Sequence, residues 1–433
     1  MRRVLKIKKI SLLLLAFLYT LSLFSVCMCA LAEDTQPPEP GIYSPHAKYM
    51  LMVDVQSDTV MYEANADATF SPGGLTKILT AITAIENYGD LSKKITVKKG
   101  YYEKYNYKDG NIGLKYDEVM SAKNMIEGLL LYDAGDCAYA LAHNIGYKKF
   151  IKSMNDIAKK AGATNSAFSN PDGCEDDNHK TTLRDMYLIT KYAMQNEFFS
   201  EVFGADRIEI GATNKSDIRI LFNKNQFLSN YYSLDNFNPN INGAKSYTNS
   251  NEDCGIVANY KTPSNDILIL CAKSDIESPI VYAYDDVEYL IKYATENYTK
   301  HTLLAAEEFV SEVNVPNAKG KKRLLLVNEK EIRTVLENNH DASKLQTKTI
   351  VNEKIRAPIK KGDVLGKTEI YYGDKKCGSS NLLAYSDMES SFFVYMGYIG
   401  GIIFGSFYFK LIIIAFIAVF VIRAISINKG KRK

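Results

Sequence analysis

Three short segments carry residues whose types and spacing indicate a single site for acyl-transfer chemistry. The first is Pro72-Gly73-Gly74-Leu75-Thr76-Lys77, a loop that leads directly into a predicted helix. A side chain at position 74 would share a helix face with Lys77, because residues three apart are neighbours on a helix. A lysine in this place can activate a serine hydroxyl, and the helix N-terminus favours the negative charge that develops. Position 74 is glycine, so the expected nucleophile is absent.

Two further segments complete the pattern, Tyr132-Asp133-Ala134-Gly135-Asp136 and Gly243-Ala244-Lys245-Ser246-Tyr247. With these residues the chain resembles the low-molecular-mass penicillin-binding proteins, which are serine-type D-alanyl-D-alanine carboxypeptidases. That family carries Ser-x-x-Lys, Ser-x-Asn and Lys-Thr-Gly. The resemblance extends along most of the chain and includes Phe168-Ser169-Asn170-Pro171-Asp172-Gly173 and Ala357-Pro358-Ile359-Lys360-Lys361-Gly362-Asp363.

The resemblance assigns a role to each motif position, and most positions depart from the family pattern. Gly74 takes the nucleophile position with the serine lost, and Lys77 takes the general-base position. Ala134 and Asp136 fall on the Ser-x-Asn positions, where a hydroxyl is lost and an amide becomes a carboxylate.

The third motif is also altered. Lys245 and Ser246 take the first two substrate-binding positions of Lys-Thr-Gly, and Tyr247 stands where glycine is expected. A glycine in a strand allows close approach of a ligand, so a tyrosine there is expected to obstruct the site.

The function implied by the resemblance is therefore that of a pseudoenzyme in peptidoglycan metabolism. Loss of the nucleophile of a serine hydrolase costs on the order of 10⁶ in kcat. We expect a catalytically inactive, membrane-anchored homologue that binds peptidoglycan stem peptide or an envelope protein. Two alternatives stay open: an active or residual D-Ala-D-Ala carboxypeptidase, and a structural tether in an envelope complex. No cofactor, metal or nucleic acid is expected.

The remaining polar residues allow plainer interpretations. Lys77 and Lys245 can be structural remnants, and we hypothesise that Lys77 pairs with Asp136, because a buried unpaired charge is costly. His179 is interpreted as a packed, hydrogen-bonding loop histidine rather than a catalytic one. The acidic run 172–177 is interpreted as a solvated loop rather than a cation site.

The elements that must position these residues suggest an α+β fold. Residues 45–300 mix helices with an antiparallel sheet, as in the penicillin-binding/β-lactamase-like transpeptidase domain that the resemblance implies. Residues 305–385 read as a small all-β domain of short strands separated by turns. Within the first domain the patterns predict helices at 75–86, 122–145, 150–160, 182–195 and 282–297, and a hairpin at 255–260 and 266–271.

Both ends of the chain carry membrane-related patterns. A basic start, an apolar stretch and Ala30-Leu31-Ala32 predict a signal peptide at 1–32, with an uncleaved anchor as the alternative. A linker at 33–44 follows. Residues 400–422 have about the length of a transmembrane helix, roughly 20 residues. The basic tail at 423–433 then predicts a cytoplasmic C-terminus, with the bulk of the chain extracytoplasmic at the cell membrane.

The composition argues against a nucleic-acid-binding, zinc-binding or disulfide-rich protein. The 433 residues are 46% hydrophobic and 24% charged, as in a globular protein, and a net charge of +3 does not suggest nucleic-acid binding. Five cysteines remain after the predicted signal peptide, without a CxxC pair, so neither a zinc site nor a disulfide framework is indicated.

Overall fold

The computed structural model describes residues 43–101, 110–248, 253–277, 280–392 and 406–430, with a few positions between 396 and 402. The predicted signal peptide at 1–32 and almost all of the predicted linker at 33–44 lie outside the described residues.

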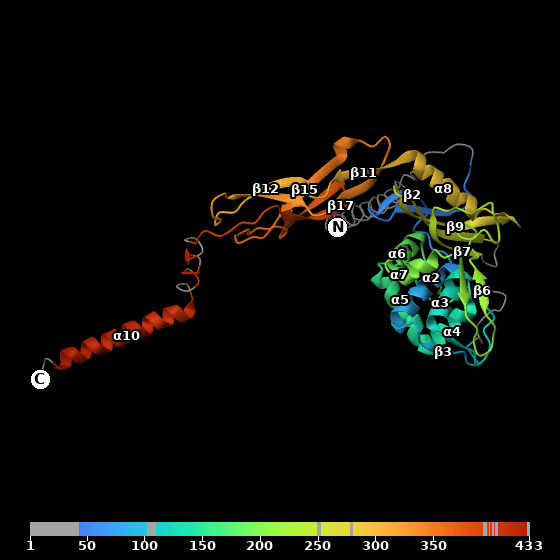
Figure 1. The fold of residues 1–433 in the computed structure, drawn as a ribbon, viewed down its shortest axis with the longest axis horizontal. Coiled ribbons are helices and arrows are strands. Elements are labelled where there is room, and N and C mark those ends of the chain that lie inside the picture. The colour runs from blue at the N-terminus through green and yellow to red at the C-terminus, as the bar shows by residue number, and fades with distance from the viewer. Residues whose placement is uncertain are drawn as a thin grey trace, which may run out of the picture.

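The first domain is built on an antiparallel sheet in the order β2-β1-β9-β8-β7, with β10 paired to β9 (Figure 1). Alternate side chains of β1 enter two different cores: Leu51 and Val53 join one hydrophobic cluster, and Met50 and Met52 join the other. Both faces of the sheet are therefore covered, which explains the nearly continuous apolar strands. The strands are β1 (Tyr49–Asp54), β2 (Thr59–Ala64), β7 (Ile241–Thr248), β8 (Asp253–Lys261), β9 (Asp266–Glu277) and β10 (Ile280–Val281).

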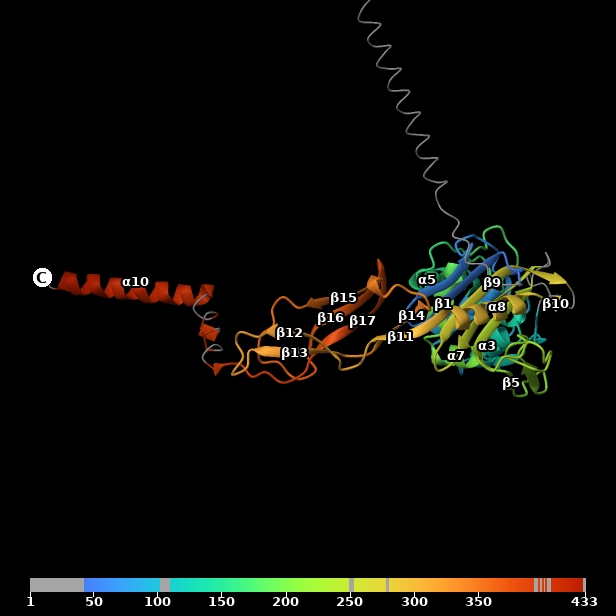
Figure 2. The ribbon, with the colours of Figure 1, turned by 90° about the horizontal axis from the view of Figure 1, so that it is seen from above.

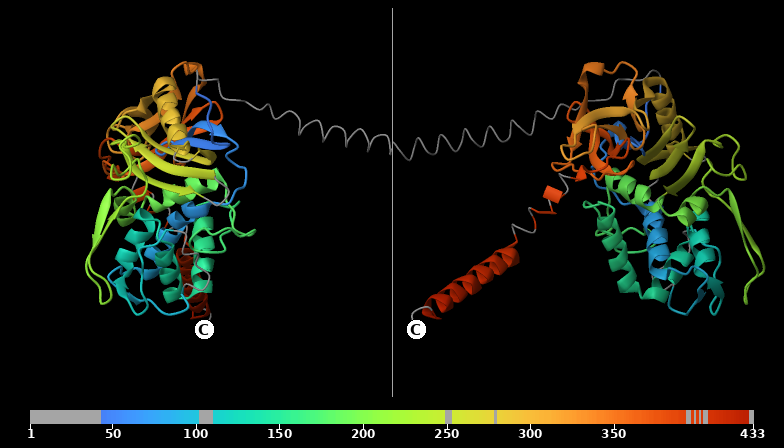
Figure 3. Two further views of the ribbon diagram at one scale, coloured as in Figure 1. Left: turned by 90° about the vertical axis from the view of Figure 1, so that its right-hand side faces the viewer. Right: turned by 60° about the vertical axis from the view of Figure 1, so that its left-hand side comes forward.

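Helices cover the two faces unequally. Figure 3 shows most of them gathered on one face of the sheet, while α8 lies on the other. α2 is buried along almost its whole length, so its first turn, which carries Lys77, lies inside the domain. The helices are α2 (Thr76–Tyr88), α3 (Ala122–Leu131), α4 (Gly135–Ile145), α5 (Tyr147–Lys160), α6 (Leu183–Ala193), α7 (Glu197–Phe203) and α8 (Ala283–Asn297).

Most predicted helices of this domain are confirmed, but the helical stretch at 122–145 divides into α3 and α4. The break falls at Asp133, which has a φ of 61°, in the left-handed region that Asp and Asn tolerate better than most residues. The predicted start of α6 is confirmed, because the Thr182 hydroxyl caps the helix by accepting a hydrogen bond from Asp185 N at 3.0 Å.

The second domain is all-β, as the sequence predicts, and extends away from the first (Figure 2). Its main sheet has the order β12-β13-β17-β16-β15, and β11 pairs with β14. Tyr298, at the start of β11, donates a hydrogen bond to Met61 O in β2 at 2.8 Å, which connects β11 to the first domain. The strands are β11 (Tyr298–Leu304), β12 (Phe309–Asn314), β13 (Arg323–Asn328), β14 (Ile332–Glu337), β15 (Leu345–Val351), β16 (Val364–Tyr372) and β17 (Lys375–Ala384).

Smaller elements complete the chain. Two short ribbons, β3–β4 (Lys94–Thr96, Val119–Ser121) and β5–β6 (Arg207–Ile210, Arg219–Phe222), flank the helices, and α10 spans Phe407–Gly430. The transmembrane helix predicted at 400–422 finds no support, because none of the helices formed by the described residues has the length and apolarity needed to cross a bilayer. All five cysteines outside the predicted signal peptide are free thiols.

Candidate active site

Gly74 lies in the single turn of 3₁₀ helix, Gly73–Leu75, that precedes α2. A Cβ on Gly74 would lie 3.2 Å from Asp133 Oδ1, 3.4 Å from Tyr247 Cβ and 3.5 Å from Ser246 O. Position 74 therefore faces the α3–α4 turn and strand β7 at once, and a Cβ there would make a tight contact with the Asp133 carboxylate.

Asp133 bridges the two lysines of the family motifs. Its Oδ1 lies 3.1 Å from Lys77 Nζ on α2 and 2.7 Å from Lys245 Nζ on β7. Lys245 also donates to Leu130 O at 3.2 Å. The ammonium groups are enclosed, since the lysine side chains are 3% and 5% exposed, whereas that of Asp133 is 28% exposed.

The electrostatics of this cluster favour a charged carboxylate. Burial alone would raise the pKa of Asp133, but the charges of Lys245 and then Lys77 outweigh it and hold that pKa below its ordinary value. Burial lowers the pKa of Lys245, and the Asp133 charge opposes this fall. Asp133 therefore supplies the negative charge that makes two enclosed ammonium groups tolerable.

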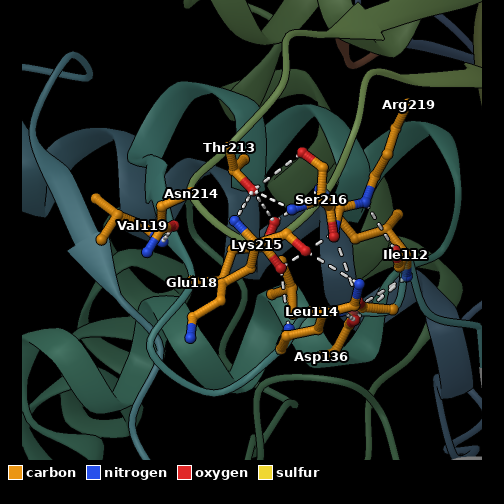
Figure 4. Close-up of polar contacts among 12 residues, drawn as sticks. Ile112, Leu114, Glu118, Val119, Asp136, Thr213, Asn214, Lys215, Ser216 and Arg219 are labelled. Atoms are coloured by element: carbon orange, nitrogen blue, oxygen red, sulfur yellow. Dashed lines mark hydrogen bonds and ion pairs between the residues drawn. The ribbon is translucent and has the colours of Figure 1, made fainter.

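The predicted Lys77–Asp136 pair is wrong, because Asp136 points toward the loop before β4 (Figure 4). Its carboxylate accepts hydrogen bonds from the backbone N–H groups of Leu114 at 3.0 Å, Cys137 at 2.9 Å and Ile112 at 3.3 Å. Asp136 is 2% exposed, and this burial raises its pKa. The residue anchors a loop to the start of α4 and lies away from the lysines.

An ion pair fixes the other side of the same loop. Glu118 is fully buried, and Arg219 on β6 pairs with it at 2.8 Å (Figure 4). Arg219 also donates to Ile112 O at 3.1 Å. Gly110, the first described residue of this loop segment, packs against the Asp133 backbone, so the network also supports the α3–α4 turn.

The register of the second motif is therefore one residue earlier than predicted. Ala134 is fully buried at the N-cap of α4, and Asp133 is the residue whose side chain reaches both lysines. The triplet that faces the site is Asp133-Ala134-Gly135, with a carboxylate where the family has a hydroxyl.

Tyr247 fills part of the site, as its position in the motif predicts. The ring is 3% exposed and lies between two glycines: a Cβ on Gly73 would come within 2.8 Å of Tyr247 Cδ2, and one on Gly255 within 2.5 Å of Cε1. Alternation along β7 puts Tyr247 on the same sheet face as Lys245, and Ser246 faces the opposite way. Ser246 also lines the cavity that the two lysines line, although its side chain faces away from theirs.

An open cavity of about 610 Å³ remains beside the cluster. Gly74, Lys77, Asp133 and Lys245 line its floor, and Lys224 lies at its wall, with Nζ 4.3 Å from the centre of the Tyr132 ring. Its lining mixes charged, amide and backbone polar groups, so it suits a polar peptide-like ligand.

His179 contacts the first residue of α2 beside the site and does not line the cavity. Its Nδ1 accepts from Ser169 N at 3.1 Å, and its Nε2 lies 2.8 Å from Thr76 Oγ1 at the first residue of α2. The side chain is 1% exposed, and burial lowers its pKa to about 4. The interpretation as a packed, hydrogen-bonding loop histidine is confirmed.

Asp133 and Lys224 are the site residues that sequence reasoning missed. The available indication for Asp133 was its residue type, because an aspartate inside a predicted helix often marks a break in that helix. Lys224 belongs to no motif of the chain, and only the fold brings it to the cavity.

Comparisons with known proteins agree with this architecture. Residues 33–269 match the family model described as D-alanyl-D-alanine carboxypeptidase, and residues 298–390 match that of the penicillin-binding protein 5 C-terminal domain. D-alanyl-D-alanine carboxypeptidase DacF of Bacillus subtilis is 25% identical over 353 residues, covering 80% of this chain and 87% of the relative. The Escherichia coli carboxypeptidase DacC is 24% identical over 388 residues, covering 86% and 90%.

Solved structures show the same fold. Penicillin-binding protein 5 from Haemophilus influenzae superposes with a TM-score of 0.63 at 20% identity, over 81% of this chain and 100% of that one. A Streptococcus pneumoniae protein described as a peptidoglycan synthesis regulatory factor (PBP3) gives a TM-score of 0.68 at 16% identity, over 80% and 100%. The match at 33–269 covers more than half of the 433 residues, so the chain belongs to the D-alanyl-D-alanine carboxypeptidase family.

Proposed function

We propose that this protein is a catalytically silent member of its family, which binds cell-wall stem peptide without forming an acyl-enzyme. One observation carries the proposal: Asp133 Oδ1 lies within 3.1 Å of both motif lysines and 3.2 Å from the place of a Cβ on Gly74.

Two steps of serine acyl transfer fail in this geometry. No hydroxyl is present at position 74 to attack a carbonyl carbon. In addition, Lys77 Nζ is engaged in an ion pair with Asp133 Oδ1 at 3.1 Å, so the lysine is not available to accept a proton from a nucleophile. Tyr247 further narrows the end of β7, along which a substrate of the family would be expected to lie.

A binding role is compatible with the cavity that remains. It keeps exposed polar groups, among them Lys224 and Glu175, and has the volume of an ordinary ligand site. The protein-binding and tether alternatives need a larger surface, whereas this open polar cavity favours a short peptide.

Export is part of the same proposal. It rests on the basic start, the apolar stretch and Ala30-Leu31-Ala32 of the sequence. Attachment to the cell membrane, predicted from 400–422, is tested together with export by fractionating cells and following the protein with an antibody.

The test of function combines labelling and binding. The full chain is incubated with fluorescent penicillin, denatured and separated on a gel, and a synthetic pentapeptide ending in D-Ala-D-Ala is titrated by NMR. We expect no band that survives denaturation, no release of D-alanine, and peptide-induced shifts that weaken in Lys224→Ala but not in Lys300→Ala, a lysine in β11. A covalent band or released D-alanine would favour residual hydrolase activity, and the absence of peptide binding would favour a protein partner.

A further inference from the structure

A second cavity lies on the outer side of α8, on the sheet face opposite the candidate active site. It measures about 400 Å³ and is bounded by α8 and the first described residue, Tyr43. Its lining combines three tyrosines with four charged residues: Tyr43, Tyr289, Tyr293, Asp285, Glu288, Lys292 and Glu296. We call it the α8 groove.

The walls of the α8 groove are aromatic. The rings of Tyr43 and Tyr289 lie 5.3 Å apart at 33°, and Tyr62 meets the ring of Tyr293 edge-on at 5.3 Å. Tyrosine rings arranged around a hollow present electron-rich faces, which attract cations when water is partly excluded.

The rim of the α8 groove carries more negative than positive charge. Three carboxylates, Asp285, Glu288 and Glu296, stand against one ammonium, Lys292. The Lys292–Glu296 contact is long, 3.9 Å, between side chains that are 73% and 59% exposed, so it neutralises the rim only weakly. Glu288 accepts a hydrogen bond from the neutral amide of Asn238 at 2.8 Å, and this contact does not neutralise the negative charge of Glu288.

One polar atom in the lining has no partner among the residues that the structure describes. The hydroxyl of Tyr289 is buried without a hydrogen bond, on a side chain that is 9% exposed. A buried polar atom of this kind normally finds a partner, because leaving it unsatisfied costs free energy. Because this atom has almost no exposed surface, a ligand in the groove does not reach it, and the ring faces and rim carboxylates are left to bind the ligand.

The chain segment that precedes Tyr43 does not match the charge of the groove. Residues 33–42 contain Glu33, Asp34 and Glu39 and no lysine or arginine. Like charges would oppose each other there, so an external cation suits the groove better than this segment.

We propose that the α8 groove binds a primary alkylammonium group, of the kind that ends a lysine-type side chain of a peptide. The apolar stem would lie against the tyrosine rings, and the ammonium would donate to the rim carboxylates. This site is separate from the Asp133 cluster and does not depend on the proposed function.

The test uses Nα-acetyl-lysine amide as the probe and the full chain as the protein, followed by ligand-observed NMR. We expect saturable binding of the lysine probe, none of the neutral isostere Nα-acetyl-norleucine amide, and weakening as salt rises. Glu288→Gln combined with Glu296→Gln should weaken binding at least about tenfold, as the loss of two attractive charges predicts. The matched control is Glu201→Gln, an exposed carboxylate on α7 far from the groove in sequence.

A second variant keeps the aromatic wall and removes only the hydroxyl. Tyr289→Phe should retain the fold and bind the lysine probe as the wild-type chain does, because the aromatic ring remains and the hydroxyl has almost no exposed surface. Equal binding of the lysine and norleucine probes, unchanged binding in the double glutamine variant, or no binding of the lysine probe by the wild-type chain would each overturn the proposal. Cadaverine is a further probe. If it binds as well as the lysine probe, the groove recognises the alkylammonium group and not the rest of the peptide.

Discussion

The carboxylate of Asp133 lies 3.2 Å from the position that a Cβ on Gly74 would take. The same oxygen pairs with Lys77, so one residue both crowds the nucleophile position and neutralises the general-base position. The lost serine and the altered second motif thus belong to one local arrangement, and restoring the serine alone leaves the ion pair in place.

The first prediction concerns recovery of acylation. Gly74→Ser alone should give no covalent penicillin adduct, because Asp133 remains ion-paired with Lys77 and the lysine is not available to the new hydroxyl. The triple change Gly74→Ser, Asp133→Ser and Tyr247→Gly should give a band that survives denaturation, at least about tenfold above Gly74→Ser, since it restores a hydroxyl, frees the lysine and removes the ring.

The control for this series is Gly74→Ala with Asp133→Ser and Tyr247→Gly, which opens the site equally but supplies no hydroxyl. Labelling of Gly74→Ser alone at the level of the triple variant would show that Asp133 and Tyr247 do not block the chemistry.

The sequence predicts the lysines of this site better than their partner. Lys77 follows a loop into a strongly apolar helix, and Lys245 lies in an alternating strand, so both positions have a fixed periodicity. Asp133 lies in a turn whose motif has lost its hydroxyl and its amide, and a turn has no periodicity that could fix its register. The choice between Asp133 and Asp136 depends on a left-handed φ at one residue, which is a property of the folded turn.

The second prediction concerns stability. Asp133→Asn should lower the free energy of unfolding by about 3 kcal/mol, because it leaves two enclosed ammonium groups without their carboxylate. Adding Lys245→Met should recover part of this loss, since one of those charges is then absent. Urea unfolding followed by circular dichroism measures both. If Asp133→Asn were neutral, the bridge would not contribute to stability.

The contribution of the Asp133 ion pairs to the stability of the protein depends on pH. The folded pKa of Asp133 is depressed, so its stabilisation is present above the unfolded value, near 3.9, and is lost as pH falls through the folded value. Wild type and Asp133→Asn should therefore converge in stability in strong acid and differ most near neutral pH.

The third prediction isolates His179. Its pKa is about 4 in the folded protein and near 6.5 in an unfolded chain. Below pH 6.5 the unfolded chain binds the proton first, so the contribution of His179 to stability is present above pH 6.5 and falls toward pH 4. The slope is at most about 1.4 kcal/mol per pH unit. His179→Gln should remove this part of the slope, whereas His340→Gln, in the all-β domain, tests whether loss of any histidine has the same effect.

The last prediction tests whether Tyr247 is packed into the site by the neighbouring glycines. Gly73→Ala should destabilise the protein, because the new Cβ would come within 2.8 Å of Tyr247 Cδ2, and the φ of +50° adds about 1 kcal/mol of strain. The control is Gly113→Ala, which has a φ of +70° but nothing within 4 Å, and so measures the effect of a positive φ without a clash. Tyr247→Ala by itself should cost about 3 to 5 kcal/mol as a buried aromatic truncation.

Combining Gly73→Ala with Tyr247→Ala separates the clash from the strain. In the double variant the ring is gone, so the effect of Gly73→Ala should fall to that of Gly113→Ala, and the two changes should be less than additive by about 1 to 2 kcal/mol. Urea unfolding of the four proteins gives this coupling directly. Full additivity would mean that the Tyr247 ring does not occupy the space above Gly73 in solution, and the site would then be more open beside Lys77 than the packing of this tyrosine implies.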